Sequence, residues 1–158
     1  MAYRPIVVFL LVPALFLASS AGAEVEQNLG ISGGFPQMIA LTYQAEVARF
    51  MSLEAYLGCL AYLNTTLGGR VILGSTSPGL RPRCFAGIAM VDQHYADKPG
   101  DPEGVEFYPW TGVGLSYEFD NGFQIFGDFV YIGKGAGDRG FGNTSPSLSF
   151  CGGLLFRL

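Results

Sequence analysis

The last part of the chain alternates between large apolar residues and small or polar ones, from Pro146 to the final Leu158. One parity holds Leu148, Phe150, Leu154, Phe156 and Leu158, and the other is mostly polar or small, with serine, cysteine, glycine and Arg157. Successive side chains of a β-strand point to opposite faces, so this period of two predicts a terminal strand with one apolar face.

A tight turn at Asp120-Asn121-Gly122 joins two further alternating segments and predicts a β-hairpin. On one parity lie Phe107, Pro109, Thr111, Val113, Leu115, Tyr117 and Phe119 before the turn, and Phe123, Ile125, Phe129 and Tyr131 after it. The opposite parity mixes charge, glycine and aromatic residues, including Glu118 and Asp128. Earlier in the chain the alternation predicts strands over 39–46, 51–59, 67–75 and 83–95, and a weak strand over 28–33. The phase of 83–95 stays open, because both of its faces are apolar in the middle.

The first 23 residues have the pattern of a cleaved secretory signal. Arg4 supplies positive charge, an apolar run follows from Ile6 to Ala18, and Ala21-Gly22-Ala23 is a small-residue cleavage site. A transmembrane anchor is the alternative, but the run is shorter than the roughly 20 residues of a spanning helix. Removing residues 1–23 takes away one arginine and no acid, so residues 24–158 are one unit more negative than the −4 of the whole chain. That acidic balance argues against recruitment of nucleic acid by bulk charge.

Residues 24–158 contain no continuous apolar stretch long enough for a spanning helix, so a membrane-spanning form must be a closed barrel. The predicted connections are tight at 45–49 and 120–122, short at 33–36 and 64–66, moderate at 76–82, and long at 96–105 and 133–145. Outer-membrane barrels place short turns in the periplasm and longer loops outside, which fixes the strand directions. Parity then predicts an all-β, closed, antiparallel up-and-down barrel of eight strands over 24–158. Its terminal strand pairs with the weak strand at 28–33, and both termini lie in the periplasm.

Alternation alone does not distinguish a membrane barrel, apolar outside, from a lipocalin-like barrel, apolar inside. Charges of both signs lie on the second parity, at Glu54, Arg70, Glu118, Asp128 and Arg157. In a narrow lumen they can pair, as buried charges must. Aromatic residues near predicted strand ends are typical of the girdles at membrane interfaces, namely Tyr43, Phe107, Tyr117, Phe119, Phe123 and Tyr131. We favour the membrane barrel with the five charges as an interior polar network. A lipocalin-like lipid or small-ligand binder, with the Ile39, Leu41, Leu53, Leu115 and Ile125 face inward, is the alternative.

The leader, the eight alternating segments, the stretch Thr111–Phe123 and the terminal strand resemble small outer-membrane β-barrel proteins of the OmpA/OmpX-like type. The resemblance is one of pattern over residues 24–158. Members of that family usually end in Phe, whereas this chain ends in Leu158 with Phe156 two residues earlier. The resemblance implies insertion by the barrel-assembly machinery, which would read Phe150, Leu154, Phe156 and Leu158, and it implies no enzyme.

The chain offers little chemistry for catalysis. The pattern expected of a lipid A deacylase of this compartment is His-x-Ser on one strand. Here His94 is followed by Tyr95 and Ala96, so His94 is disfavoured as a catalytic base. Four acids lie in or beside the first long loop, at Asp97, Asp101, Glu103 and Glu106. Their spacing does not match an EF-hand, so a solvated acidic loop is favoured over a divalent-cation site. The odd number of cysteines, Cys59, Cys84 and Cys151, favours small apolar fillers, with one disulfide left open.

The sequence therefore predicts a non-enzymatic, monomeric barrel of a Gram-negative outer membrane, without catalytic, metal or cofactor sites. A lumen of eight strands is about filled by its own side chains, so open porin-like conduction is not expected. Expected partners are outer-membrane lipid, lipopolysaccharide, periplasmic chaperones and the assembly machinery. Recognition of other partners is assigned to the loops at 96–105 and 133–145, because loops on a rigid scaffold carry binding.

Overall fold

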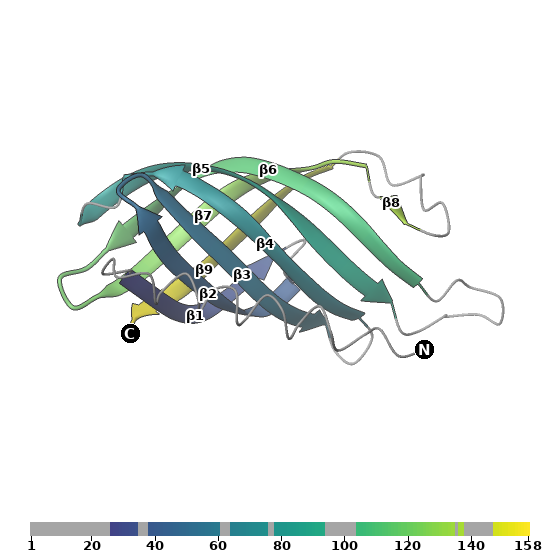
Figure 1. The fold of residues 1–158 in the computed structure, drawn as a ribbon, viewed down its shortest axis with the longest axis horizontal. Helices are drawn as coiled ribbons and strands as arrows, with labels where there is room; N and C mark the ends of the chain where they lie inside the picture. Colours follow the sequence, from purple (N-terminus) through teal and green to yellow (C-terminus); the bar gives the residue numbers. More distant parts are fainter. Residues whose placement is uncertain are drawn as a thin grey trace.

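The computed structural model describes residues 26–34, 38–60, 64–75, 78–93, 104–134, 136–137 and 147–158, which form one antiparallel sheet. Its strands are β1 (Glu26–Gly34), β2 (Met38–Ala48), β3 (Met51–Leu60), β4 (Asn64–Gly74), β5 (Gly79–Gln93), β6 (Gly104–Glu118), β7 (Phe123–Ile132), β8 (Ala136–Gly137) and β9 (Ser147–Arg157). Figure 1 shows these strands running obliquely to the long axis of the molecule.

The sheet closes on itself. The strand order is β5-β4-β3-β2-β1-β9-β7-β6, and an additional pairing between β5 and β6 joins the two edges. The two-residue β8 pairs only with Glu106 and Phe107 of β6, so the closed barrel has eight full-length strands. The weak predicted strand at 28–33 is confirmed as β1, and its pairing with the terminal strand β9 is confirmed as well. Eight strands in an up-and-down barrel therefore agree with the sequence prediction.

The register of the pairs fixes how the strands tilt. Successive paired residues around the barrel are Arg157, Asn28, Gln44, Glu54, Arg70, Gly87, Trp110, Ile132 and Ser147. This path starts and ends on β9, and its two ends lie ten residues apart, at 157 and 147. With the usual strand spacing and rise, a stagger of ten over eight strands gives a tilt of about 40° and a barrel radius of about 8 Å. All nine residues belong to the inward parity, so side chains from every strand meet in a narrow lumen.

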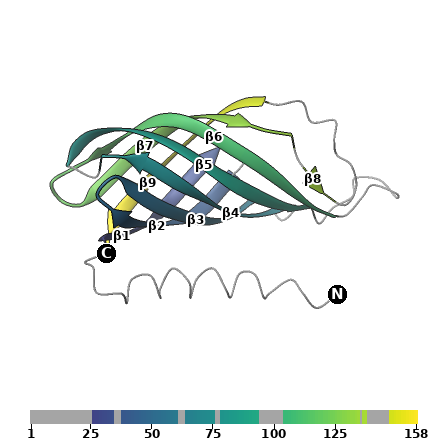
Figure 2. The same cartoon turned by 45° about the horizontal axis from the view of Figure 1, so that its top comes forward.

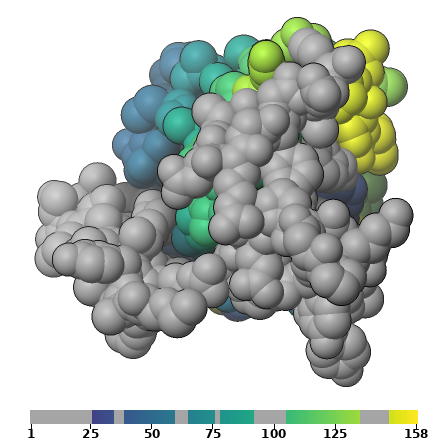
Figure 3. Space-filling model, turned by 90° about the vertical axis from the view of Figure 1, so that its right-hand side faces the viewer, coloured from purple at the N-terminus to yellow at the C-terminus, as the bar shows by residue number. Residues whose placement is uncertain are grey.

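The two ends of the barrel differ. We define the turn rim by residues 49–50, 74–75, 78–79 and 119–122 together with Glu26 and Leu158. We define the loop rim as the opposite end, where Gly34, Leu60, Gln93, Gly104 and Ile132 lie (Figures 1 and 2). In an end-on view from the loop rim, blue atoms of β2 and β3 lie on one side and yellow atoms of β9 on the other (Figure 3).

Backbone hydrogen bonds fasten the C-terminal strand at the turn rim. Arg157 N donates to Gly122 O at 3.0 Å, and Leu158 N donates to Gln27 O at 2.9 Å. The predicted hairpin turn is confirmed, and Gly122 adopts a φ of 78°, which glycine tolerates better than residues with a Cβ. The turn of the β6–β7 hairpin thus also supports the end of β9.

The apolar parity faces outward. Ile39 is 69% exposed, Leu115 52% and Phe129 70%, whereas their neighbours Ala40, Ser116 and Val130 are buried. This result contradicts the lipocalin-like alternative, which required the Ile39 and Leu115 face to point into a cavity. The phase left open over 83–95 is now fixed within 83–91, with Arg83, Phe85, Ala89 and Val91 inward.

Several predicted strand limits were wrong, and residues 33–34, 104–105 and 136–137 of the predicted connections also lie in strands. The connection predicted at 76–82 is shorter, because β5 begins at Gly79 and carries Arg81 and Arg83 into the lumen. The connection predicted at 64–66 belongs to β4, and the turn predicted at 45–49 begins later, because β2 continues to Ala48 through an irregularity between Glu46 and Ala48. At 64–66 and 79–82, pairing with the neighbouring strand extends the strand into residues whose composition is typical of turns, whereas residues 45–48 are Ala, Glu, Val and Ala.

Several predictions concern residues outside the described part of the chain. These are the leader at 1–23, His94, and most of the two long loops at 96–105 and 133–145. Within the described residues, no helix is long and apolar enough to cross a membrane.

Candidate functional site in the barrel lumen

Four charged side chains meet in the middle of the lumen, and we call them the central cluster: Glu54 of β3, Arg70 of β4, Arg83 of β5 and Asp128 of β7. Arg70 donates from Nε to Glu54 Oε1 at 2.7 Å, from Nη2 to Glu54 Oε2 at 2.9 Å, and from Nη1 to Asp128 Oδ2 at 2.7 Å. Arg83 donates from Nε to Asp128 Oδ1 at 2.8 Å and from Nη2 to Asp128 Oδ2 at 2.5 Å. Two cations therefore balance two anions through paired hydrogen bonds, the strongest geometry for such ions.

Aromatic rings surround the two guanidinium groups. The Arg70 guanidinium carbon lies 4.6 Å from the ring centre of Phe85, 5.1 Å from Trp110 and 5.5 Å from Phe126. The Arg83 guanidinium carbon lies 4.2 Å from the ring centre of Phe126. The side chains of Glu54, Arg70 and Asp128 are completely buried. The rings supply cation–π attraction where water is excluded, which offsets part of the cost of removing these ions from water.

The register and two glycines explain why this arrangement forms. Glu54 and Arg70 are direct cross-strand partners, and Gly114 of β6 lies between Arg83 and Asp128 in the register. A Cβ on Gly114 would lie 2.0 Å from Asp128 Oδ1, and a Cβ on Gly87 would lie 2.7 Å from Arg70 Cβ. Glycine at these two inward positions leaves room for side chains that reach across the lumen.

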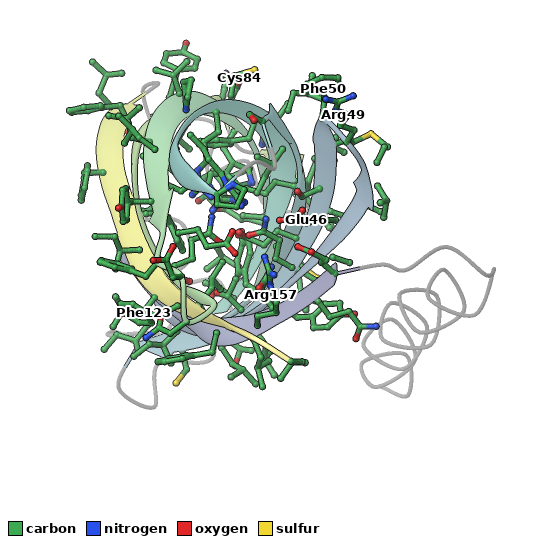
Figure 4. All side chains as sticks on the ribbon, turned by 90° about the vertical axis from the view of Figure 1, so that its left-hand side faces the viewer. Glu46, Arg49, Phe50, Cys84, Phe123 and Arg157 are labelled. Carbon is green, nitrogen blue, oxygen red and sulfur yellow. The ribbon has the colours of Figure 1, made fainter. Side chains whose placement is uncertain are left out.

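A second group of charges, the rim cluster, lies at the turn rim: Glu26, Glu46, Arg81, Glu118 and Arg157. Glu118 accepts hydrogen bonds from both Arg81 Nη2 and Arg157 Nη2. Arg81 Nη1 also lies 3.3 Å from Glu46 Oε1, and Arg157 Nη2 lies 2.9 Å from Glu26 Oε2. Figure 4 looks into this end and shows Glu46 and Arg157 directed into the lumen, while Phe50, Cys84 and Phe123 lie on the outside. Burial falls across this cluster, since the side chains of Arg157 and Glu26 are 39% and 44% exposed.

The lumen between the central cluster and the loop rim is mainly apolar. Trp110 is 2% exposed and meets the Tyr56 ring edge-on, with 5.8 Å between the ring centres. Other buried members of this region are Ala40, Ala89, Val91, Tyr108, Val130, Ile132 and Cys151. Nearer the loop rim, Tyr108 donates a hydrogen bond to Glu106. Because Glu106 is only 4% exposed, its assignment to a solvated acidic loop was wrong.

The structure brings the predicted charges together in two places. Glu54, Arg70 and Asp128 lie in the central cluster, and Glu118 and Arg157 lie in the rim cluster. The sequence prediction missed Glu26, Glu46, Arg81 and Arg83 as partners. Arg83 lay inside the predicted strand over 83–95, whose phase was open, and extending that strand past Pro82 toward Gly79 would have added Arg81 on the same parity.

The cysteines and the terminal strand are the remaining features that the sequence singled out. Cys59 and Cys84 are exposed free thiols, so they do not act as buried fillers, while Cys151 is a buried free thiol whose Sγ lies 3.7 Å from Asp128 Oδ2. The four apolar residues predicted for the terminal strand, Phe150, Leu154, Phe156 and Leu158, all lie on the exposed face of the barrel. Phe150 lies over two outward glycines, Gly127 and Gly152, and fills the space that side chains would take there. Among the described residues, no three His, Cys, Asp or Glu side chains gather as metal ligands would.

Comparisons with known proteins identify the fold alone. No family model matches the sequence, and a search of curated proteins finds no match. Among solved structures, the N-terminal β-barrel domain of OprF from Pseudomonas aeruginosa matches with a TM-score of 0.65 and 16% identity, covering 85% of this chain and 96% of that chain. A de novo designed protein, TMB2.3, matches with a TM-score of 0.55 and 15% identity, covering 87% and 98%. A structure from the de novo design of transmembrane β-barrels matches with a TM-score of 0.51 and 12% identity, covering 85% and 94%. The chain therefore has the fold of small outer-membrane and designed transmembrane β-barrels.

Proposed function

We propose that this chain is an integral outer-membrane β-barrel protein of a Gram-negative bacterium, with a closed lumen and no enzymatic activity. One observation supports this proposal most: the barrel has apolar residues on its outer face and ion pairs inside. Glu54, Arg70 and Asp128 are fully buried, while Ile39, Val113 and Phe129 are 60–70% exposed. Such a surface is stabilised by hydrocarbon and destabilised by water.

The dimensions of the barrel fit a bilayer. Strands of ten or eleven residues, such as β2, β3 and β9, tilted by about 40°, give an apolar band about 25 Å high, as in outer-membrane barrels. At the turn rim, four rings touch in series, with centre distances of 4.8 Å (Tyr117–Phe119), 5.5 Å (Phe119–Phe123) and 4.9 Å (Phe123–Phe156). Aromatic rings gather in this way where hydrocarbon meets the headgroups.

The proposed topology follows from the two rims. The turn rim faces the periplasm, and the loops at 96–105 and 133–145 face outward, where they carry any recognition of lipopolysaccharide or of other partners. The terminal strand, with Phe150, Leu154, Phe156 and Leu158, is the segment that the barrel-assembly machinery reads after periplasmic chaperones deliver the chain. The inserted protein is a monomer without a cofactor.

Cysteine labelling tests which face is covered by lipid. In a variant whose three native cysteines are replaced, Leu115→Cys is outward and Ser116→Cys is its inward neighbour and matched control. We expect a bilayer-confined maleimide to label Leu115→Cys and to leave Ser116→Cys unmodified in isolated outer membranes. Labelling of neither site, with recovery of the protein as a soluble periplasmic monomer, would contradict the proposal. Slower gel migration after boiling is a second expected sign of an inserted barrel.

Two further measurements separate the proposed role from its alternatives. We expect no steady conductance in planar bilayers, because Trp110, Tyr56 and the central cluster fill the lumen. We also expect the lipid A composition of cells to be unchanged by the His94→Ala substitution. A conductance like that of an open porin, or altered lipid A, would replace the structural role by transport or by lipid modification.

A further inference from the structure

A small cavity lies inside the barrel between the two charge clusters. Its volume is about 20 Å³, and its lining includes Gln44, Ser52, Arg81, Arg83, Ser116 and Gln124. Arg83 belongs to the central cluster and Arg81 to the rim cluster, so one arginine of each cluster lines the cavity, and Gly74 and Ser75 line it at the turn rim. Its walls come from β2, β3, β4, β5, β6 and β7, which are fixed by the closed ladder of strand pairs.

Two buried polar atoms belong to side chains that line this cavity. Arg83 Nη1 and Gln44 Oε1 have no hydrogen-bond partner among the described residues. Both side chains are more than nine-tenths buried, since Arg83 is 6% exposed and Gln44 is 3% exposed. Arg83 uses its other two nitrogens, Nε and Nη2, on Asp128. A donor and an acceptor without partners are costly inside a protein, and here the side chains that carry them line the same cavity.

We propose that this cavity binds one structural water molecule, which accepts a hydrogen bond from Arg83 Nη1 and donates one to Gln44 Oε1. The volume is enough for a single water molecule. The pair of atoms selects water over an ion. An anion would oppose the Gln44 carbonyl oxygen, and the charge of Arg83 is already matched by Asp128. A cation would lie beside the guanidinium groups of Arg81 and Arg83.

The water has a structural consequence for the lumen. It extends hydrogen bonding from the central cluster, through Arg83, to Gln44 of β2. This role rests on the barrel and its interior. It does not depend on the membrane, so it remains testable if the proposed location is wrong.

A crystal structure of the wild-type protein, at a resolution that shows ordered water, tests the site. We expect one density peak about 2.7–3.2 Å from both Arg83 Nη1 and Gln44 Oε1. A clear map without that peak, or a direct contact between the two side chains, would overturn the proposal. A second crystal soaked in bromide should show no anomalous signal in the cavity, and a bromide peak there would reassign it as an anion site.

Two substitutions test whether the water peak depends on the shape of the cavity. Ser116→Val places an extra methyl group against the space, so its crystals should lose the peak while the barrel is unchanged. Thr65→Val is the matched control, because Thr65 lies on the outward parity of β4 and does not line the cavity, so the peak should persist. Retention of the water in Ser116→Val, at the same place, would show that the cavity does not define the site. If Ser116→Val does not fold, the two wild-type crystals still decide the proposal.

Discussion

The central cluster and the rim cluster are built from the same residue types but differ in what surrounds them. In the central cluster the ion pairs join side chains that are 0–3% exposed, beside the rings of Phe85, Trp110 and Phe126. In the rim cluster the pair between Arg157 and Glu26 is partly open to solvent. A partly exposed ion that loses its partner regains water, whereas a buried one does not.

The charge balance of each cluster follows this difference. The central cluster has two arginines and two carboxylates, which leaves no net charge in a region without solvent. The rim cluster has two arginines and three glutamates, and the surplus is tolerated because Glu26 is 44% exposed. We therefore expect substitutions in the central cluster to lower the unfolding free energy strongly and independently of salt. Substitutions in the rim cluster should lower it slightly and in a salt-dependent way.

The largest effect is expected from Arg70→Met. The variant removes one cation and leaves Glu54 and Asp128 buried with Arg83 as the remaining partner, which should cost about 3–5 kcal/mol of unfolding free energy. Urea titration in detergent or lipid vesicles can follow it through Trp110, the single tryptophan of the chain, whose ring lies 5.1 Å from the Arg70 guanidinium. Arg49→Met, at an exposed turn residue, is the control and should change stability by less than about 0.5 kcal/mol. Equal stabilities of the two variants would show that the central ion pairs contribute little.

The next effect is expected from Gly114→Ala. The new Cβ would lie 2.0 Å from Asp128 Oδ1 and 2.5 Å from the Gly127 carbonyl oxygen, so Asp128 must move away from Arg83. Overpacking of this kind should cost about 1–3 kcal/mol in the same urea titration. Gly69→Ala is the matched control on the outward parity, where the nearest atom is the Glu54 carbonyl oxygen at 3.2 Å, and its effect should be smaller. If the order of the two variants were reversed, room for Asp128 would not be the reason for glycine at position 114.

A double-mutant cycle on Arg81 and Glu118 examines the more buried half of the rim cluster. Their side chains are 4% and 8% exposed, between the values of the centre and those of the Arg157–Glu26 pair. We expect Arg81→Gln and Glu118→Gln together to cost less than the sum of the single variants, with a coupling free energy of about 1 kcal/mol. Coupling as large as that between Arg70 and Glu54 would erase the distinction between the two clusters.

The sequence predicted the wall of the barrel better than its contents. Alternation at 107–119 and 123–131 assigned the two faces correctly, because a period of two is a property of each strand by itself. The pairing of Arg70 with Asp128 could not be predicted, because these residues are 58 positions apart and meet only through the stagger of the closed barrel. Arg81 was missed for a local reason, since Pro78 and Pro82 are typical of a turn although β5 passes through this segment. To predict which charges belong to the central cluster and which to the rim cluster, the register of all eight strands must be known.

The smallest effect is expected from Arg157→Gln at the turn rim. Arg157 is 39% exposed and contacts Glu118 and Glu26, so losing its charge should cost less than about 1 kcal/mol at low ionic strength. Raising the salt concentration to about 1 M shortens the screening length to roughly 3 Å, so the difference from wild type should then disappear. Arg70→Met, measured in parallel, should keep its full cost at both salt concentrations, because its partners are not in contact with solvent. A salt-independent loss in Arg157→Gln would indicate that Arg157 acts through packing at the end of β9, where its backbone amide is bonded to Gly122, and not through its charge.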